Sequence, residues 1–330
     1  MKFSLIICTY HRLDALNRLL ESVRSQTALP TQIIIVDGSI DAQTADQFQK
    51  NKEERIEYYK VGKEYRGLTK QRNFGVSKVD ISVDVISFLD DDTVLEPTFF
   101  EEVMKVYNKY PEAVGVSGYI TNEVIWKKIP LEFQTSNRTF TFDGWMRENS
   151  MRFRIRKILG LSPDVPPGFM PQFSHGYALG FIPPSGKTYE VEMLMGGITS
   201  YKRSLFEKLL FSSYFEGYGL YEDADFSIRA SRKGKLFVNT LAKVEHHHDP
   251  GGRPNPFKYG KMVLRNGWYV WRVKEPNPSA KAQIKWNAIS FLLTLIRLGN
   301  GITDKNAFME ALGRIWGWWS LILKKPMHEN

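Results

Sequence analysis

A strand that runs directly into three carboxylates constrains this chain more than any other stretch. Residues 85–89 (VISFL) are apolar and rich in β-branched and aromatic types, which predicts a buried strand. Asp90, Asp91 and Asp92 follow without a break. Three adjacent carboxylates are costly to bury unless a cation or donors meet them, so we expect a turn at the carboxyl edge of a sheet. Ligands bind at that edge in open α/β sheets, and Mg²⁺ or Mn²⁺ prefers oxygen ligands. For the triplet alone, the alternative is a solvated acidic turn that caps a helix from about Pro97.

Further apolar runs alternate with helical patterns. Residues 2–9 (KFSLIICT) and 32–36 (QIIIV) predict two buried strands, and leucines at helical spacing over 13–23 predict the helix between them. Residues 56–61 predict a third strand, so residues 85–89 would form the fourth. Continuous apolar strands joined by helices are typical of a parallel sheet with right-handed crossovers. We therefore expect an α/β fold with a mostly parallel sheet, helices on both of its faces, and a C-terminal helical segment.

Charge and periodicity divide the chain. Between residues 120 and 190 prolines are frequent and long periodic segments are few, which predicts an elaboration on the core. Residues 251–330 hold 13 Lys+Arg and 4 acidic residues, so the whole net charge of +9 belongs to them. We expect one main domain over 1–250 and a basic amphipathic helical tail over 251–330. The single cysteine, Cys8, excludes a disulfide framework and suits a reducing compartment.

Two more polar clusters could join the Asp triplet in one site. Residues 67–75 (GLTKQRNFG) predict a glycine turn opening a helix, with Lys70 and Arg72 near free N–H groups that suit a diphosphate. An ordinary helix start with solvated cations is the alternative. Glu222 and Asp223 follow a run of glycines and aromatics that is typical of a sugar cleft, where a carboxylate could act as general base. Simple capping of the next helix is the alternative there.

The stretch from residue 204 to residue 248 ends in three histidines. SLFEKLLF from Ser204 predicts a helix, and residues 236–238 and 242–245 predict two strand-like pieces. His246 and His248 would share a face if the strand continues, so one could reach a cation held by the Asp triplet. A solvated loop is the alternative reading of the histidines.

Seven short segments follow one another along residues 1–250: CTYHR at 8–12, VDGS at 36–39, GLTKQRNFGV at 67–76, FLDDD at 88–92, GG at 196–197, YEDADFSIRA at 221–230 and AKVEHHH at 242–248. Taken together, these segments resemble the family 2 glycosyltransferases of the GT-A fold. The resemblance spans almost all of residues 1–250 and implies a nucleotide-diphospho-sugar donor, a divalent cation (Mn²⁺ or Mg²⁺) and inversion at the anomeric carbon.

The resemblance also implies roles for individual residues. Asp92 would ligate the metal as the last acid of the DxD pattern, with His246 as the metal-proximal histidine and His248 as its substitute. Asp223 would be the catalytic base, with Glu222 beside it. The residues implied to bind the nucleotide-sugar are Thr9, Tyr10, Arg12, Asp37, Lys70, Arg72, Asp90, Asp91 and Gly197.

The second motif departs from the family pattern. Many members have a further residue between the aspartate and the glycine, whereas Gly38 follows Asp37 directly. Asp37 is the residue implied to meet the base. The choice among uridine, thymidine and guanosine donors therefore stays open.

The tail contains two apolar, aromatic runs, residues 286–298 and 308–323, each flanked by cations. Neither has the ~18 uninterrupted apolar residues of a spanning helix, because Arg297 and Arg314 interrupt them. They suit helices lying on an anionic membrane surface. The alternative is a helical pair packed on the catalytic domain or on a second subunit, so self-association into a homo-oligomer stays open.

We expect an inverting, metal-dependent glycosyltransferase that moves a sugar to a hydroxyl of a glycan or lipid-linked acceptor in cell-surface polysaccharide synthesis. We expect it in the cytoplasm, peripheral on the inner face of the cell membrane. A catalytically silent sugar-nucleotide-binding or scaffold protein and a sugar nucleotidyltransferase are the alternatives. A nucleic-acid partner is not expected, because the basic excess accompanies tryptophan-rich apolar faces rather than a polar basic groove.

Overall fold

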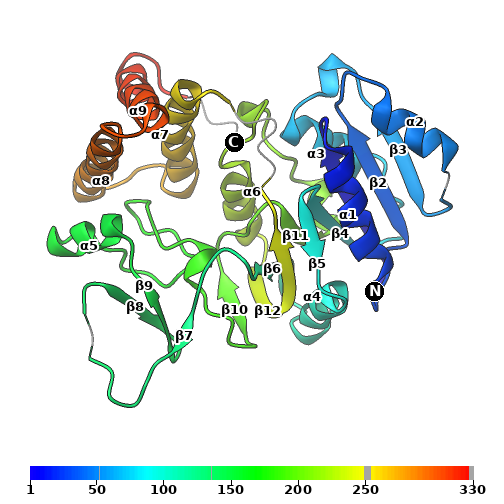
Figure 1. Ribbon diagram of the computed structural model, residues 1–330, viewed down its shortest axis with the longest axis horizontal. Coiled ribbons are helices and arrows are strands. Elements are labelled where there is room, and N and C mark those ends of the chain that lie inside the picture. Colours follow the sequence, from blue (N-terminus) through cyan, green and yellow to red (C-terminus); the bar gives the residue numbers. More distant parts are fainter. Residues whose placement is uncertain (52, 135, 249–253, 327–330) are drawn as a thin grey trace. The chain divides into compact units, whose positions relative to one another are not determined.

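The computed structural model describes residues 1–51, 53–134, 136–248 and 254–326 (Figure 1). The chain forms two compact units. We call residues 1–124 with 184–252 the sheet unit, and residues 125–183 with 253–330 the helical unit. The division at residue 250 that we drew from sequence lies outside the described residues and stays a prediction.

The sheet unit is built on one large mixed sheet. Its strand order is β10-β12-β6-β11-β4-β1-β2-β3, and β5 also pairs with β12. Strands β3, β2, β1 and β4 are mutually parallel, as are β6 and β12, whereas β11 is antiparallel to both β4 and β6. The strands are β1 (Phe3–Thr9), β2 (Gln32–Asp37), β3 (Ile56–Lys60), β4 (Val85–Asp90), β5 (Thr93–Leu95), β6 (Ala113–Ile120), β10 (Thr188–Val191), β11 (Ile198–Lys202) and β12 (Lys235–His246).

Helices cover both faces of this sheet, which confirms the predicted α/β architecture. The α-helices of the unit are α1 (Leu13–Arg24), α2 (Gln43–Lys50), α3 (Leu68–Val76), α4 (Phe99–Lys109) and α6 (Glu222–Ser231). On one face, Leu5 and Leu89 join a core with residues of α1 and α4. On the other face, Gly75 of α3 lies so close to Ile6 that an added Cβ would come within 2.7 Å of it. The α6 side of the sheet is packed with aromatic rings, such as Phe206 and Phe226 with centroids 5.3 Å apart.

Register aligns the polar ends of the central strands. Thr9 at the end of β1 pairs with Asp37 of β2, and Cys8 pairs with Asp90 of β4. Because these strands are parallel, their carboxyl ends meet at one edge of the sheet. The strand that the sequence predicted over 85–89 is β4, and its final residue is the first of the three aspartates.

Three local features of the sheet unit differ from the sequence expectations. The helix expected from Ser204 is a short 3-10 turn over Arg203–Glu207. The two strand pieces near 236–245 are one strand, β12, with a register shift against β6 between Val238 and Lys243. The sequence reading also missed β11, which follows the glycine pair directly, because the strand is only five residues long and Gly196-Gly197 resembles a plain turn.

The helical unit contains a small antiparallel sheet, β7-β9-β8, and long C-terminal helices. Figure 1 shows α7, α8 and α9 side by side. Trp271, Trp286 and Ile289 are part of its buried core, and the first two stack with ring centroids 5.3 Å apart. Within the described residues, no helix combines the length and hydrophobicity that crossing a bilayer requires. The elements are β7 (Lys127–Lys128), β8 (Thr139–Phe142), β9 (Trp145–Glu148), α5 (Met151–Ile158), α7 (Pro256–Lys274), α8 (Ala280–Asn300) and α9 (Lys305–Leu323).

Candidate functional site

The three aspartates at the end of β4 contact different partners. The carboxylate of Asp91 is buried, where Oδ2 accepts a hydrogen bond from Thr9 Oγ1 at 2.7 Å and Oδ1 accepts one from Arg12 Nη1 at 3.1 Å. Burial raises the pKa of Asp91 to about 7, although Thr9 and Arg12 oppose the rise. Arg12 also lies 3.4 Å from Asp92 Oδ2. Asp91 is therefore bonded to Thr9 and Arg12, whereas Asp92, which is also buried, lies with Asp90 near His246.

Asp90, Asp92 and His246 form a group that could hold a cation. One ligand atom from each lies within 4.8 Å of the others. His246 Nε2 is 3.2 Å from Asp92 Oδ1, and burial lowers the histidine pKa less than Asp92 and Glu123 raise it, so the pKa of His246 reaches about 10. A strongly raised histidine pKa indicates a site of high negative potential. Two carboxylates with one imidazole suit a divalent cation that also takes diphosphate oxygens, so the residues present fit the Mn²⁺ or Mg²⁺ predicted from sequence.

Arg72 links the acidic turn to the start of α6. Its guanidinium is buried, donates to Asp90 Oδ1 at 3.3 Å and to the Gly196 carbonyl oxygen at 3.0 Å, and forms an ion pair with Glu222. The rings of Phe88 and Phe211 flank it at 5.8 and 5.3 Å. Because Asp90 and Glu222 compensate the charge of Arg72, we infer that this side chain mainly positions the acids around it.

The glycine pair before β11 is needed for this close packing. A Cβ added to Gly197 would lie 2.4 Å from Asp90 Oδ2, and one added to Gly196 would lie 2.6 Å from Glu222 Oε1. No side chain fits at either distance without movement. The Asp90 N–H also donates to the Gly197 carbonyl oxygen at 2.9 Å. Gly197, a predicted binding residue, therefore lies against the acidic turn.

The two acids at the start of α6 differ in exposure. Asp223 is partly exposed, and its oxygens accept hydrogen bonds from the N–H groups of Gly196 at 3.1 Å and Ala224 at 2.8 Å. Burial raises the pKa of Asp223, although these N–H groups oppose the rise. Glu222 is buried against Arg72, and burial raises its pKa to about 8 against the opposing charge of Arg72. Asp223 is thus the acid that an incoming molecule could reach.

Three predicted nucleotide-binding residues lie at the margins of this group. Asp37 is fully buried, and its carboxylate accepts from the Tyr58 hydroxyl at 2.6 Å and the Ser39 N–H at 2.7 Å. Tyr10 is exposed at the end of β1, where its ring could stack on a base. Lys70 forms an ion pair with Glu216 at 3.0 Å. Tyr10 and Lys70 therefore present groups to solvent at this edge, whereas Asp37 is satisfied internally.

Glu123 was missed by the sequence reading. It follows β6, accepts a hydrogen bond from His246 Nδ1 at 3.1 Å and lies 2.9 Å from His248 Nε2. The contact with His246 is the largest cause that lowers the pKa of Glu123. An acid just beyond the end of a sheet strand was the available signal, but the pairing of β6 with β12 could not be read from the sequence.

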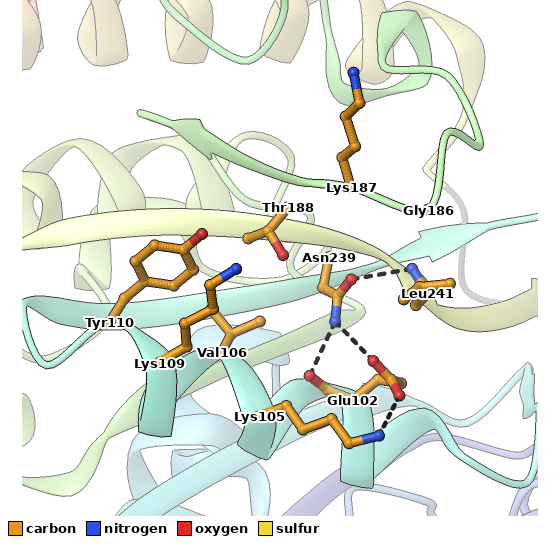
Figure 2. Close-up of a pocket in the computed structure, with 10 residues that line it drawn as sticks. All are labelled: Glu102, Lys105, Val106, Lys109, Tyr110, Gly186, Lys187, Thr188, Asn239 and Leu241. Carbon is orange, nitrogen blue, oxygen red and sulfur yellow. Dashed lines mark hydrogen bonds and ion pairs between the residues drawn. The ribbon is translucent and has the colours of Figure 1, made fainter.

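A separate groove lies between α4, β10 and β12, with a volume of about 480 Å³ (Figure 2). Figure 2 shows Asn239 in its wall, where the side-chain amide donates to the Glu102 carbonyl oxygen at 2.9 Å. The lining includes none of the predicted site residues. It is formed by Glu102, Lys105, Val106, Lys109, Tyr110, Gly186, Lys187, Thr188, Asn239 and Leu241.

The sequence of this chain is similar to those of known glycosyltransferases. The chain is 29% identical over 143 residues to a glucosyl-dolichyl phosphate glucuronosyltransferase from Haloferax volcanii, covering 40% of this chain and 44% of the relative. It is 36% identical over 106 residues to the uncharacterized glycosyltransferase YwdF of Bacillus subtilis, covering 32% of this chain and 38% of the relative. The chain spans less than half the length of these curated relatives.

A solved structure described as GalNAc-T7 with UDP, GalNAc and Mn²⁺ superposes on this chain with a TM-score of 0.51 at 16% identity. The match covers 92% of this chain and 58% of that one, and it confirms the predicted GT-A fold. The family model described as Glycosyl transferase family 2 matches residues 4–174, which is more than half of the chain. The chain therefore belongs to glycosyl transferase family 2.

Proposed function

We propose that this transferase is metal-dependent and inverting, and that it moves a sugar from a nucleotide-diphospho-sugar to a hydroxyl of a glycan or lipid-linked acceptor. One observation carries the proposal: contacts through Arg72 and Gly196 join the Asp90–Asp92–His246 group to Asp223. A cation group for the donor and a carboxylate for the acceptor then belong to one site. A bound divalent cation would neutralise the diphosphate and stabilise the leaving oxygen.

The protein's own residues would orient the donor. Arg12, which donates to Asp91 and Asp92, and Arg72, which donates to Asp90, hold the acidic turn in one conformation. Tyr10 offers an exposed ring for the base. The internal bonding of Asp37 supports a role in fixing the end of β2 as well as any contact with the base, and the identity of the base is left to experiment.

Asp223 would take the proton of the acceptor hydroxyl. Its partial exposure leaves it accessible, and its raised pKa makes it a stronger base than a solvated aspartate. Glu222, buried in its ion pair with Arg72, would position the site. A single base with direct displacement inverts the anomeric carbon.

The acceptor and location are also proposals. The name of the Haloferax relative includes a dolichyl phosphate sugar, which supports a lipid-linked acceptor here. We propose a role in cell-surface polysaccharide synthesis, with the enzyme in the cytoplasm and bound through residues 251–330 to an anionic membrane surface. Self-association through the same segment is the alternative partner.

Two measurements test the proposal. Thermal shift with a panel of nucleotide-sugars and Mn²⁺ should reveal the donor, and proton NMR of the product from that donor should show an inverted anomeric centre. A silent sugar-nucleotide-binding protein would be stabilised by the donor but would neither hydrolyse nor transfer the sugar. A nucleotidyltransferase would instead release pyrophosphate from a nucleoside triphosphate and a sugar phosphate. Either outcome would overturn the proposed reaction.

A further inference from the structure

Helix α9 carries an apolar stripe on its solvent-facing side. Its members recur every three or four residues along the helix, as one face of an α-helix requires. Trp319 is 61% exposed and Leu323 is 84% exposed, values that are unusual for large apolar side chains. We call this set the outer stripe: Phe308, Leu312, Ile315, Trp316, Trp319, Ile322 and Leu323.

The packing of α9 on α7 explains why the stripe faces outward. A Cβ added to Gly313 would lie 2.0 Å from the Phe257 carbonyl oxygen, and one added to Gly260 of α7 would lie 2.0 Å from the Glu310 carbonyl oxygen. The two helix backbones are therefore in direct contact, which only glycine permits. This contact fixes the rotation of α9, so the opposite, aromatic side cannot turn toward α7.

The segment that carries the stripe has an excess of positive charge. Residues 254–326 contain 12 Lys+Arg and 3 acidic residues. One of those acids, Glu310, is buried and paired with Arg297 at 2.7 Å and Arg314 at 2.6 Å. Exposed Lys324 and Lys325 follow the stripe directly. A second copy would set like charges against one another, whereas an anionic bilayer offers both apolar depth and opposite charge.

We propose that the outer stripe docks on an anionic bilayer, with α9 lying in the interface and the indoles of Trp316 and Trp319 at headgroup depth. Lys324 and Lys325 would contact the acidic headgroups. This deepens the membrane partner proposed above by naming the binding face. Because the stripe contains no site residue, lipid binding can be measured separately from sugar transfer.

The test is flotation of the full chain with vesicles of 70% phosphatidylcholine and 30% phosphatidylglycerol. We expect the wild type to float. The partition coefficient of the double variant Trp316→Glu/Trp319→Glu onto vesicles should be lower by ~10-fold or more, because two apolar side chains are replaced by charged ones. The matched control is Leu131→Glu, which changes a fully exposed leucine elsewhere in the helical unit and should float normally. Lys324→Glu/Lys325→Glu should remove the salt-sensitive part of binding.

Equal flotation of the stripe variant and the wild type would overturn the proposal, as would a wild type that does not float. Size-exclusion chromatography with light scattering distinguishes self-association from lipid binding. If the wild type is a dimer that does not float and the stripe variant is a monomer, the stripe mediates self-association. Transfer to a soluble acceptor should be unchanged in the stripe variant. If the wild type transfers no sugar to a soluble acceptor, that result counts against the proposed function and not against the lipid-binding surface.

A different observation concerns the two ring nitrogens of His246. Nε2 faces Asp92 Oδ1 at 3.2 Å, whereas Nδ1 faces Glu123 Oε1 at 3.1 Å. A neutral imidazole has one nitrogen lone pair to give and one N–H to donate. With Nε2 toward the cation group, Nδ1–H donates to Glu123, and this outer hydrogen bond fixes both tautomer and ring orientation.

We infer that Glu123 is a positioning residue for His246, an inference that rests on the proposed metal dependence. The same atoms permit one rival, since Glu123, His246 and His248 also have ligand atoms within 4.8 Å of one another. That group is the more exposed of the two, because Glu123 and His248 both face solvent while Asp92 is buried. The buried group is therefore the one that Glu123 would support.

Binding of Mn²⁺, followed by electron paramagnetic resonance, tests this without activity. Glu123→Ala should weaken Mn²⁺ affinity ~10-fold or more, Glu123→Gln should recover part of the loss as an acceptor, and His248→Ala should bind normally. Unchanged affinity in Glu123→Ala would overturn the inference. Loss of binding in His248→Ala would instead assign the ion to the exposed group, and a wild type without Mn²⁺ binding would overturn the metal dependence itself.

Discussion

The two units of this chain differ in what they bury and what they expose. In the sheet unit, charged groups such as Arg72, Glu222 and Asp91 are buried and bonded to one another or to neighbouring side chains. In the helical unit, large apolar side chains such as Trp316 and Trp319 are exposed. Each arrangement departs from what folding stability alone favours. Buried charges are costly to desolvate, and an apolar side chain left exposed does not contribute the free energy that its burial would.

The free energies involved show how far each unit departs from maximal stability. Burial of an exposed large apolar side chain would contribute about 1.5–3 kcal/mol, so the outer stripe leaves several such contributions unused. Breaking a buried ion pair costs about 3–5 kcal/mol, so the acids around Arg72 are strongly coupled to the fold. The proposed transferase site in one unit and the proposed lipid-docking surface in the other would account for both departures.

The largest expected effect is the loss of transfer when the cation group in the sheet unit is removed. Asp92→Ala removes one hard ligand where the diphosphate would be neutralised, so transfer should fall by ~10³-fold. Steady-state rates at saturating Mn²⁺ measure it, with Asp80→Ala, an exposed acid outside the site, as control. Retained metal-dependent transfer in Asp92→Ala would be incompatible with the assignment.

The second test separates the two acids of α6. Asp223→Asn keeps size and hydrogen bonding but removes the base, so turnover should fall by ~10²-fold with donor affinity little changed. Glu222→Gln weakens the pair with Arg72, so its main effect should be a lower thermal midpoint. Kinetics and unfolding are measured on both variants. If Glu222→Gln abolishes turnover in a folded protein while Asp223→Asn turns over normally, the base is Glu222.

The third test addresses the helical unit alone. Gly313→Val places side-chain atoms against the Phe257 carbonyl oxygen, where even a Cβ has only 2.0 Å, so we expect a loss of about 2 kcal/mol or more in the free energy of unfolding. The control is Gly299→Ala in α8, which has no neighbouring atom within 4 Å among the described residues and should be neutral or stabilising. Equal denaturation midpoints for Gly313→Val and the wild type would show that α7 and α9 are not in direct contact.

The smallest expected effect is a pH dependence in the helical unit. Burial lowers the pKa of His175 from 6.5 to about 3, and its Nε2 lies 3.2 Å from Ser290 Oγ. The unfolded chain takes up this proton below pH 6.5 and the folded chain does not, so the stabilisation is complete above pH 6.5 and is lost as the pH falls toward 3. Between pH 7 and pH 5, His175→Gln should therefore lose about 2 kcal/mol less than the wild type in the free energy of unfolding measured with urea. His247→Gln, at an exposed histidine, should follow the wild type.

Much of the sheet was predictable because its strands carry local signals. Apolar runs that end in polar residues identified β1, β2 and β4, and the same pattern led to the Asp triplet. The short strands β5, β10 and β11 lack such runs, and their pairing depends on partners distant in sequence. The aspartate that ends β4 was therefore predictable, whereas the antiparallel β11 that places Gly197 against it was not.

The sequence predicted which residue types form the site better than it predicted which of them contact one another. The residue types at 90–92, 222–223 and 246 indicated the chemistry, but the sequence could not show that Asp91 bonds to Thr9 while Asp92 meets His246. Glu123 was missed for the same reason, because only the pairing of β6 with β12 brings it to the histidines. The joining of residues 125–183 with 253–330 in one unit also depends on long-range packing.

The most direct test of the proposed cation site is a crystal structure of the protein with Mn²⁺ and a nucleoside diphosphate, with anomalous data collected near the manganese edge. We expect an anomalous peak at coordination distance from an Asp92 oxygen and from His246 Nε2, with diphosphate oxygens completing the shell. A nucleotide bound without manganese at this edge would contradict it. So would manganese held solely by Glu123 and His248.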